Sequence, residues 1–336
     1  MDKKVYLETL GCSKNRVDSE IMLGSLNNQG YQFTDDAEEA EVIIVNTCGF
    51  LSAASQESIT RILELSDLKQ EGRCEKLVAA GCVTQRYGSE LAQKIPEIDG
   101  LLGSSGFEQI PELLDQLYHP EGQFKQFLQK KPHYRQYQQQ ERIQSTPSHY
   151  AYLKIAEGCS NMCSFCNIPY LRGGFSSRSI ESLVQDFSQL VERGVSEINL
   201  LSQDTSSYGK DLRDGTELSG LLRALISVPG DYWIRMFYCY PNSFTDEVLE
   251  VMASDPRFCR YLDMPFQHIS DPVLKKMNRK ITRKEIEATM ARVRRQLPDV
   301  AWRTTFIVGF PTETDQDFEE LLDRKSTRLN SSHQII

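Results

Sequence analysis

Three features are missing from this sequence, and each absence excludes a class of protein. No apolar run approaches the roughly 20 residues of a membrane-spanning helix, so we expect no membrane association. The opening residues, MDKKVYLETLGC, lack the uncharged apolar core of a secretory signal peptide, which favours the cytoplasm. A basic excess is also missing: the net charge is −9 and the pI is near 5.3. Dedicated nucleic-acid binders are usually basic, so we do not expect nucleic acid as the direct substrate.

The length and the cysteine content limit the remaining possibilities. A domain has roughly 150 residues, so a chain of 336 residues is expected to form two domains. An odd count of nine cysteines, without a signal peptide, favours reduced thiols over disulfides. Cys74, Cys239 and Cys259 match no motif, and we interpret them as structural thiols.

Short apolar strands alternate with helical stretches over residues 1–118. Residues 4–12 (KVYLETLGC), 40–50 (AEVIIVNTCGF) and 76–82 (KLVAAGC) each predict a strand that ends at a neighbouring Gly and Cys. Such alternation is typical of a parallel sheet built from βαβ units. We therefore expect an α/β domain of the Rossmann or flavodoxin-like kind over residues 1–118.

Three cysteines of this domain, Cys12, Cys48 and Cys82, form what we call the first trio. They follow one another at intervals of 36 and 34 residues, about one βαβ repeat each. Each is thus expected at the carboxyl end of a parallel strand, the edge where open α/β sheets bind ligands. Buried cysteines near strand ends are common, which is the plainer alternative.

A polar, Gln-rich stretch at residues 119–148 predicts a linker, and a second domain is expected over residues 149–322. Five strand-and-helix units in series predict a partial (β/α) barrel whose working face lies at the strand carboxyl ends. The last stretch, residues 323–336, shows no apolar period and completes no sixth unit. We expect it to be disordered, and a non-native origin is an open alternative. The five predicted strands lie within residues 149–159, 197–209, 233–241, 261–268 and 302–314.

The stretch EGCSNMCSFCNIPYLRGG, residues 157–174, holds the second trio: Cys159, Cys163 and Cys166. Their spacing is C-x3-C-x2-C, and no fourth Cys or His lies nearby in the sequence. Structural zinc sites prefer four protein ligands, so a zinc or purely electron-carrying site is the less favoured alternative. Three thiolates can hold three corners of a cubane 4Fe–4S cluster, which leaves the fourth iron free for a non-protein ligand.

This motif, in a loop after a strand of a predicted partial barrel, resembles the radical S-adenosylmethionine (SAM) superfamily. The resemblance implies that SAM chelates the open iron through its amino and carboxylate groups. One electron from the cluster would then cleave SAM into methionine and a 5′-deoxyadenosyl radical. The aromatic Phe165, just before the third cysteine, also fits the superfamily pattern.

Within that superfamily, the chain resembles the methylthiotransferase family over about residues 3–322. GCSKNRVDSE, NTCGF and AGCVTQR match its three N-terminal motifs. The resemblance implies a second 4Fe–4S cluster on the first trio, which delivers sulfur. One SAM would donate a methyl group and another would be the radical source, with an electron donor such as flavodoxin or ferredoxin. The family normally continues into a sixth barrel strand and a TRAM β-domain, which we expect to be missing here.

The segments NIPYLRGGFSSRS, LGCSKNRVDSE and LLSQDTSSYG look more like one branch of this family than the other. That branch modifies the β carbon of an aspartate in small-subunit ribosomal protein S-twelve, and the acidic chain suits a basic ribosomal partner. The other branch modifies a tRNA adenosine and tends to read VPYTRG. A tRNA substrate therefore stays open, as does a different class, a non-catalytic iron–sulfur binding module.

Further candidate SAM contacts lie at strand ends. Gln203 and Asp204 follow the second predicted barrel strand, and His268 ends the fourth. Arg178 is a candidate partner of the SAM carboxylate. Each has a plainer interpretation: Gln203 and Asp204 as turn residues that cap a helix, Arg178 as a surface side chain, and His268 as a histidine with local partners.

Overall fold

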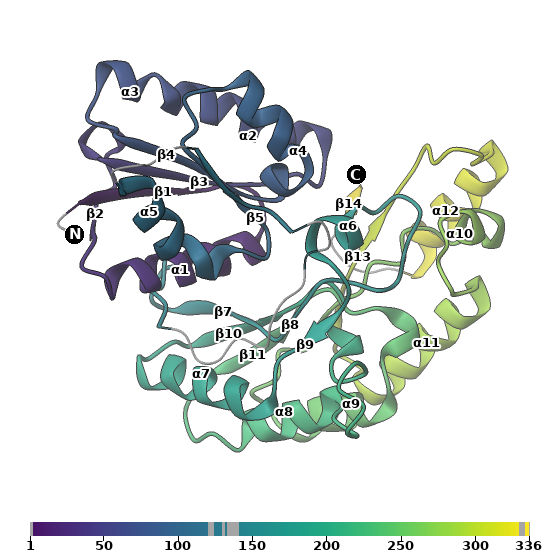
Figure 1. The fold of residues 1–336 in the computed structure, drawn as a ribbon. Coiled ribbons are helices and arrows are strands. Elements are labelled where there is room, and N and C mark those ends of the chain that lie inside the picture. Colours follow the sequence, from purple (N-terminus) through teal and green to yellow (C-terminus); the bar gives the residue numbers. More distant parts are fainter. Residues whose placement is uncertain (1–2, 120–123, 130–131, 133–140, 329–332, 336) are drawn as a thin grey trace. The chain divides into compact units, whose positions relative to one another are not determined.

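The computed structural model describes residues 3–119, 124–129, 132, 141–328 and 333–335. The chain forms two compact units (Figure 1). The first unit contains Met1–Thr146 and Asn167–Gly174, and the second contains Pro147–Cys166 and Phe175–Ile336. Within the described ranges, no helix is both long enough and apolar enough to cross a membrane.

The first unit contains a parallel six-stranded sheet in the order β2-β1-β3-β4-β5-β6. Every residue of β3 is buried, as is all of β4 except its first residue, because helices cover both faces. The order 2-1-3-4-5 is that of flavodoxin-like folds, which confirms the predicted fold class of this unit. The strands are β1 (Lys4–Thr9), β2 (Gln32–Phe33), β3 (Val42–Thr47), β4 (Lys76–Gly81), β5 (Gly100–Gly103) and β6 (Lys125–Phe127).

Helices of the first unit lie on both faces of this sheet, with α1 and α5 on one face and α2, α3 and α4 on the other (Figure 1). Ile62 and Leu65 of α2 pack with Ile43, Val45 and Leu77 of the sheet. The helices are α1 (Ser13–Asn27), α2 (Ser52–Ser66), α3 (Leu68–Glu71), α4 (Cys82–Lys94), α5 (Ile110–Tyr118) and α6 (Ile168–Arg172). Two 3-10 turns, η1 (Ala37–Glu39) and η2 (Phe107–Gln109), complete the unit.

The structure differs from the predicted linker at residues 119–148. Strand β6 pairs with β5 at the sheet edge. The backbone N–H and the hydroxyl of Ser145 donate to the buried carboxylate of Glu20 in α1, at 2.8 and 3.0 Å. Neither the pairing of β6 with a strand edge nor the bonds of Ser145 to a carboxylate require an apolar pattern. The sequence pattern therefore did not predict these two contacts. Parts of the predicted linker, residues 120–123, 130–131 and 133–140, lie outside the described residues.

The second unit contains parallel strands that follow one another in chain order. Strand β10 pairs with β7 and β11, and β12 pairs with β13. A parallel bridge between Ile234 and Phe258 links β11 to the segment before β12. The strands are β7 (Tyr150–Lys154), β10 (Glu197–Leu201), β11 (Trp233–Met236), β12 (Tyr261–Asp263) and β13 (Ala301–Phe306), with an antiparallel pair of β8 (Ala156–Glu157) and β9 (Ser176–Ser177).

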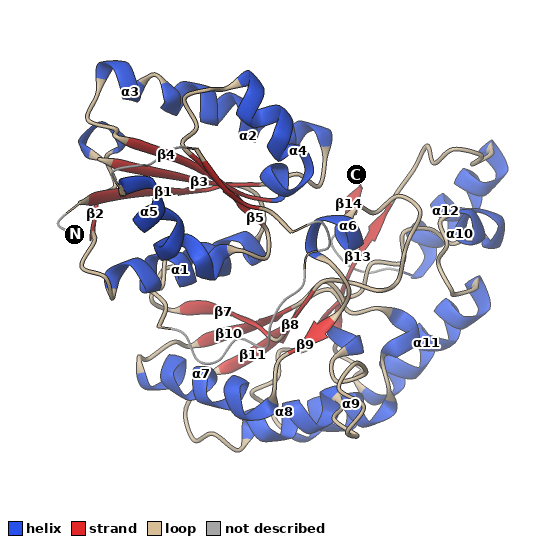
Figure 2. Cartoon of the chain, viewed as in Figure 1, coloured by secondary structure: helices blue, strands red, loops and turns tan. Residues whose placement is uncertain are grey.

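Helices follow these strands, as expected for β/α units (Figure 2). Leu183, Phe187 and Leu190 on one side of α7 are buried in the core of this unit. Thr282 and Glu285 form a capping box at the start of α11, as TRKE predicts. The helices are α7 (Ile180–Glu192), α8 (Leu218–Ile226), α9 (Asp246–Ser254), α10 (Asp271–Lys276), α11 (Arg283–Gln296) and α12 (Asp315–Arg328), with 3-10 turns η3 (Thr205–Ser207) and η4 (Pro241–Ser243).

The expectation that the tail is disordered and adds no sixth strand is wrong in part. Helix α12 continues to Arg328, and β14 (His333–Ile335) pairs in parallel with β13. The free edge of β13 offers backbone donors and acceptors to any sequence, so pairing needs no apolar period. Residues 329–332 and 336 of the predicted tail lie outside the described residues.

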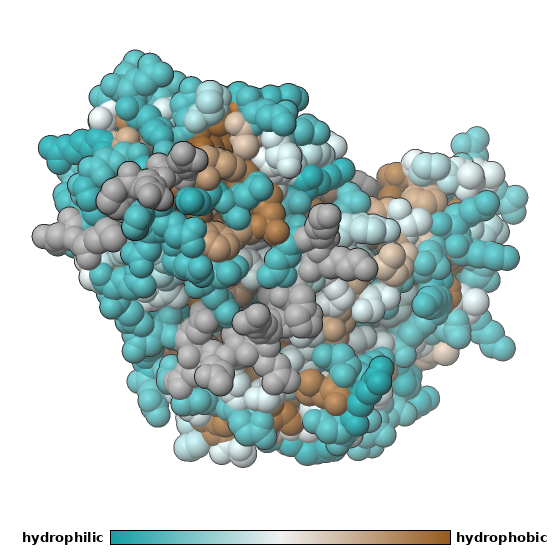
Figure 3. Space-filling model, in the orientation of Figure 1, coloured by the Kyte–Doolittle hydropathy of each residue, from teal (hydrophilic) through white to brown (hydrophobic). Residues whose placement is uncertain are grey.

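Hydrophilic side chains predominate on the face of the molecule shown in Figure 3. Apolar side chains are also buried inside each unit, in clusters that include Ile43 and Ile62 in the first unit and Leu183 and Phe187 in the second. Burial of this kind is the main favourable term in folding, so each unit contains its own source of stability.

Candidate metal centres

The first trio lies at the carboxyl edge of the sheet of the first unit. Cys12 follows β1, Cys48 follows β3 and Cys82 follows β4, and these three strands are neighbours. The order of this sheet reverses between β1 and β3, and doubly wound folds bind ligands at such a reversal. Cys12 is exposed, Cys48 is half-buried and Cys82 is buried.

Glycines let the three loops approach one another. A Cβ on Gly11 would lie 2.4 Å from the Cβ of Cys48 and 2.8 Å from its Sγ, and Gly11 has a φ of +89°. A Cβ on Gly49 would lie 2.9 Å from the carbonyl group of Cys82. Both positions therefore require glycine, and the close packing brings the loop of each cysteine against the next.

The thiols of the first trio are close enough to influence one another electrostatically. Burial raises the pKa of the Cys82 thiol to about 11; the Arg172 guanidinium opposes this shift, and Cys12 and Cys48 add to it. Burial likewise raises the pKa of Cys48, with Cys12 again contributing. All nine cysteines lie in the described part of the chain, and all are free thiols.

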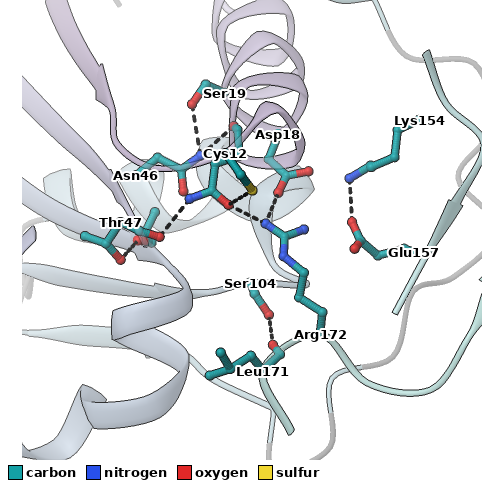
Figure 4. Close-up of polar contacts among 12 residues, drawn as sticks. Cys12, Asp18, Ser19, Asn46, Thr47, Ser104, Lys154, Glu157, Leu171 and Arg172 are labelled. Atoms are coloured by element: carbon teal, nitrogen blue, oxygen red, sulfur yellow. Dashed lines mark hydrogen bonds and ion pairs between the residues drawn. The ribbon is translucent and has the colours of Figure 1, made fainter. Parts of the chain in front are cut away.

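A buried polar network supports the loop of Cys12 (Figure 4). The Asn15 amide donates to the carbonyl oxygens of Leu10 and Thr47, at 3.0 and 2.8 Å. The Arg172 guanidinium donates to Asn15 Oδ1 and, at 2.8 Å, to Asp18 Oδ2. The Cys12 Sγ lies 3.9 Å from the same Asn15 oxygen. One amide thus connects the ends of β1 and β3 to a cation.

Arg172 was missed as a site residue by the sequence reasoning. It follows Cys166 by six positions, yet the segment Asn167–Gly174 belongs to the first unit. The Ser104 hydroxyl donates to the Leu171 carbonyl and helps hold α6 there. The only sequence signal was an arginine between a cysteine motif and two glycines, which does not reveal its partners.

The second trio lies in the loop that follows β8. The Cys166 N–H donates to the Cys163 carbonyl at 3.0 Å, which closes a turn between the last two cysteines. Burial raises the pKa of Cys159 to about 11; Asp204 and the other two cysteines raise it further, against a hydrogen bond from the backbone of Asn161. The three thiols therefore gather in one loop, as their spacing predicts.

The residues that follow α10 form hydrogen bonds with this loop. The Ser164 N–H donates to the Met277 carbonyl at 3.0 Å, and the Asn278 amide donates to the Met162 carbonyl at 2.7 Å. Met162 has a φ of +54°, a backbone conformation that residues other than glycine rarely adopt. Sequence reasoning did not find this contact, because nothing in the pattern links residues so far apart.

A buried ion pair lies just before the second trio. The Lys154 ammonium is 2.7 Å from Glu157 Oε2, and both side chains are at most 1% exposed. Glu157 also accepts from the Gln203 amide and from the Gly158 N–H. This carboxylate is thus tied to β7, to the end of β10 and to the start of the cysteine loop.

The candidate SAM contacts of this unit mostly have protein partners. Asp204 accepts from the Asn161 side chain at 2.8 Å and thereby supports the cysteine loop. Arg178 is buried and pairs with Asp186 at 2.7 Å, so it is not the surface residue of the plainer interpretation. Phe165 is half-buried within the cysteine loop.

His268 is buried, and both of its ring nitrogens have neighbours. The Ser270 N–H donates to Nδ1 at 3.0 Å, and Nε2 lies 3.4 Å from Glu313 Oε1. This arrangement matches the plainer interpretation of a histidine with local partners. A role of Phe165, Gln203, Asp204, Arg178 or His268 in SAM binding stays a prediction.

The chemistry of the donor sets fits iron–sulfur clusters, because both trios consist of thiols. In the described part of the chain, no three His, Cys, Asp or Glu side chains are placed to hold one metal ion. Each thiolate of a cubane binds a different iron atom, so the sulfurs need not converge on one point. Cysteine thiolates are the usual ligands of such clusters, so the residues present fit the group.

Two family models match the chain. The model described as Uncharacterized protein family UPF0004 matches residues 4–103, which include the first trio. The model described as Radical SAM superfamily matches residues 153–324, which include the second trio.

Curated relatives match nearly the whole chain. Ribosomal protein uS12 methylthiotransferase RimO of Geotalea uraniireducens is 46% identical over 321 residues, covering 95% of this chain and 71% of the relative. The protein of the same name from Myxococcus xanthus is 46% identical, covering 97% and 67%. That from Desulfitobacterium hafniense is 43% identical, covering 96% and 72%.

Solved structures share the fold at low sequence identity. The radical SAM methyltransferase TsrM from Kitasatospora setae, with tryptophan and a SAM analogue bound, has a TM-score of 0.70 at 14% identity, covering 99% of this chain and 73% of that one. The cobalamin-dependent SAM radical enzyme OxsB has a TM-score of 0.66 at 12% identity, covering 96% and 51%. These similarities support the predicted radical SAM fold.

Proposed function

Because the chain belongs to the ribosomal protein uS12 methylthiotransferase family of the radical SAM superfamily, we propose that it adds a methylthio group to ribosomal protein uS12. Identity of 46% across 95% of the chain supports this substrate over a tRNA adenosine. The acceptor in our proposal is the β carbon of an aspartate. Its C–H bond is too strong and too weakly acidic for a general base, so the difficult step belongs to cofactors.

We propose that each trio holds one 4Fe–4S cluster, the auxiliary cluster on the first trio and the radical cluster on the second. The observation that carries this proposal is the placement of three thiols at neighbouring strand ends in the first unit and of three more in one loop after β8 in the second. When bound, the two clusters and SAM supply the radical, the sulfur atom and the methyl group. The chain supplies three thiolates per site and leaves one corner of each cluster without a protein ligand.

Residues around the trios orient these thiolates. Asn15, held by Arg172, fixes the loop of Cys12 against the end of β3. In the second unit, Asp204 holds the cysteine loop through Asn161. Hydrogen bonds of this kind set the direction of a ligand before it binds metal.

Charge and chemistry suggest the partners. A chain with a net charge of −9 attracts a basic protein such as a ribosomal protein, alone or within the small subunit. The radical site requires a one-electron donor, for which we propose a flavodoxin or ferredoxin. Because such partners are cytoplasmic, we propose the same location for this protein.

The test is methylthio transfer by the reconstituted protein. The protein, loaded with iron and sulfide, is incubated with SAM and a reductant, and uS12 and tRNA are offered separately. We expect a mass gain of one methylthio group on a uS12 aspartate, and none with the Cys12→Ala or Cys163→Ala variant. A gain on tRNA alone would overturn the substrate, and no 5′-deoxyadenosine from cluster-loaded protein would favour a non-catalytic module.

A second measurement tests the number of clusters. Iron and sulfide are counted in the wild type and in a Cys159→Ala, Cys163→Ala, Cys166→Ala variant. Retention of about half the iron in the variant is expected if the trios bind independently, since each cubane has the same iron content. Complete loss would contradict two independent sites.

A further inference from the structure

A buried arginine of the second unit lies against one thiol of the second trio. Arg279 is 8% exposed, and its Nη1 donates to the Cys163 Sγ at 3.7 Å. Its Nη2 donates to the Pro265 carbonyl at 2.6 Å, and the guanidinium lies over the Tyr240 ring, 4.0 Å from the centroid. The cation is therefore held in place on three sides.

The partners of Arg279 differ from those of two other arginines in the same unit, Arg178 and Arg257. They are a thiol, a carbonyl group and an aromatic ring, whereas Arg178 and Arg257 pair with Asp186 and Asp255. Among the described residues, the Arg279 Nε has no hydrogen-bond partner. None of these partners is a carboxylate, and Cys163 becomes a thiolate when it binds iron, so that thiolate is an anion in contact with the guanidinium.

The backbone before Arg279 maintains this contact. Met277 and Asn278 bond to Ser164 and Met162, the two residues that flank Cys163. Asn278 itself has a φ of +53°, which turns the chain sharply after α10. Residues 277–279 thus contact residues 162–164 of the cysteine loop. These contacts fix the Arg279 guanidinium relative to the Cys163 sulfur.

We propose that Arg279 raises the reduction potential of the 4Fe–4S cluster held by the second trio. Reduction moves one electron from an external one-electron donor, which is oxidised, to the cluster, which gains one negative charge. A fixed cation and an N–H···S bond stabilise the more negative state more strongly, and both are known determinants of cluster potential. Arg279 acts through Cys163, so it is a positioning residue.

This inference rests on the proposed function only in placing a cluster on the second trio. The experiment uses the full chain with Cys12→Ala, Cys48→Ala and Cys82→Ala, so that one cluster remains. Arg279→Gln and Arg279→Lys are compared in this background by redox titration with dithionite, followed by electron paramagnetic resonance. The matched control is Arg257→Gln, because Arg257 is also a partly buried arginine over a tyrosine ring, at 4.9 Å.

We expect Arg279→Gln to lower the ratio of reduced to oxidised cluster about tenfold at a fixed potential. This is the low end of what a charged hydrogen bond contributes, and it equals a shift of about 59 mV for a one-electron couple. Arg279→Lys keeps the positive charge, so its reduction potential should lie much closer to that of the starting protein than the potential of Arg279→Gln does. Arg257→Gln should titrate like the parent, and the iron content should be equal in all variants.

Each contrary result has a separate meaning. The parent is the chain with Cys12→Ala, Cys48→Ala and Cys82→Ala. If this parent binds no iron, the proposed radical cluster is wrong, and the result does not depend on Arg279. If the parent binds a cluster and Arg279→Gln titrates identically, the inference is overturned. Equal shifts in the Gln and Lys variants would also overturn it, because the charge would not be the cause. Loss of iron from both variants would show that Arg279 is only a structural support.

Discussion

Replacement of Arg172 by methionine tests the buried network beside the first trio. The Arg172 guanidinium lies 2.8 Å from Asp18, and the two side chains are 1% and 4% exposed. Removing one partner of a buried ion pair leaves an uncompensated charge, which costs about 3–5 kcal/mol of unfolding free energy. The Asn15 oxygen also loses its donor, at a further cost of about 1 kcal/mol.

Two comparisons isolate this effect. Arg61 pairs with Glu8 at 2.6 Å and with Glu64 at 2.9 Å, but its side chain is 33% exposed. Ion pairs that solvent can reach contribute about 1 kcal/mol, so Arg61→Met should lower the unfolding free energy less than Arg172→Met. A double variant, Arg172→Met with Asp18→Leu, removes both buried charges and should recover most of the lost stability.

The assay is thermal unfolding of the cluster-free chain, combined with hydrogen exchange of amides in α1 and α6. A loss of this size lowers the unfolding temperature of the first unit by on the order of 10 °C. Exchange in α1 and α6 assigns the loss to this unit, because amides there report its local opening free energy. If Arg172→Met costs no more than Arg61→Met, the reasoning from buried charge is refuted.

Two further predictions concern the loop before Cys12 and the buried thiol of Cys74. Gly11→Ala places a Cβ 2.4 Å from the Cβ of Cys48, so we expect loss of about half the bound iron. Gly30→Ala, at a similar φ of +79° with no atom within 4 Å, should keep it; equal iron in both would contradict the packing argument. Burial raises the pKa of Cys74 to about 11, so iodoacetamide should modify it far more slowly than exposed Cys12 at pH 7. The difference between the two modification rates, measured by mass spectrometry, should become smaller as the pH rises toward 11. Equal rates at pH 7 would refute the argument from burial.

Much of the fold followed from local pattern. Apolar runs ending at Gly and Cys predicted β1, β3 and β4, and the structure has strands there. The errors fell in polar stretches: β6 lies in the predicted linker and β14 in the predicted tail. Both are short edge strands held by backbone hydrogen bonds, and backbone groups are the same in every sequence.

The candidate sites divide in the same way. The spacing of the first trio predicted that its cysteines follow neighbouring strands, since βαβ repeats place successive strand ends on one edge. That either trio binds a cluster stays a prediction. The partners of Gln203, Arg178 and His268 were not predictable. Each residue pairs with a carboxylate, and the sequence contains many Asp and Glu residues that could have had that role. Glu157, Asp186 and Glu313 have these roles in the structure.

By itself, the sequence determined the candidate donor atoms, the two α/β units and the strand ends at which the cysteines of the first trio lie. Periodicity and spacing carry that information because they act over one βαβ repeat. Only the tertiary structure decided which cation lies beside each trio. Arg172 reaches Asp18 across 154 positions and Arg279 reaches Cys163 across 116. Contacts at such separations are selected by the packing of whole elements, which leaves no periodic trace in the chain.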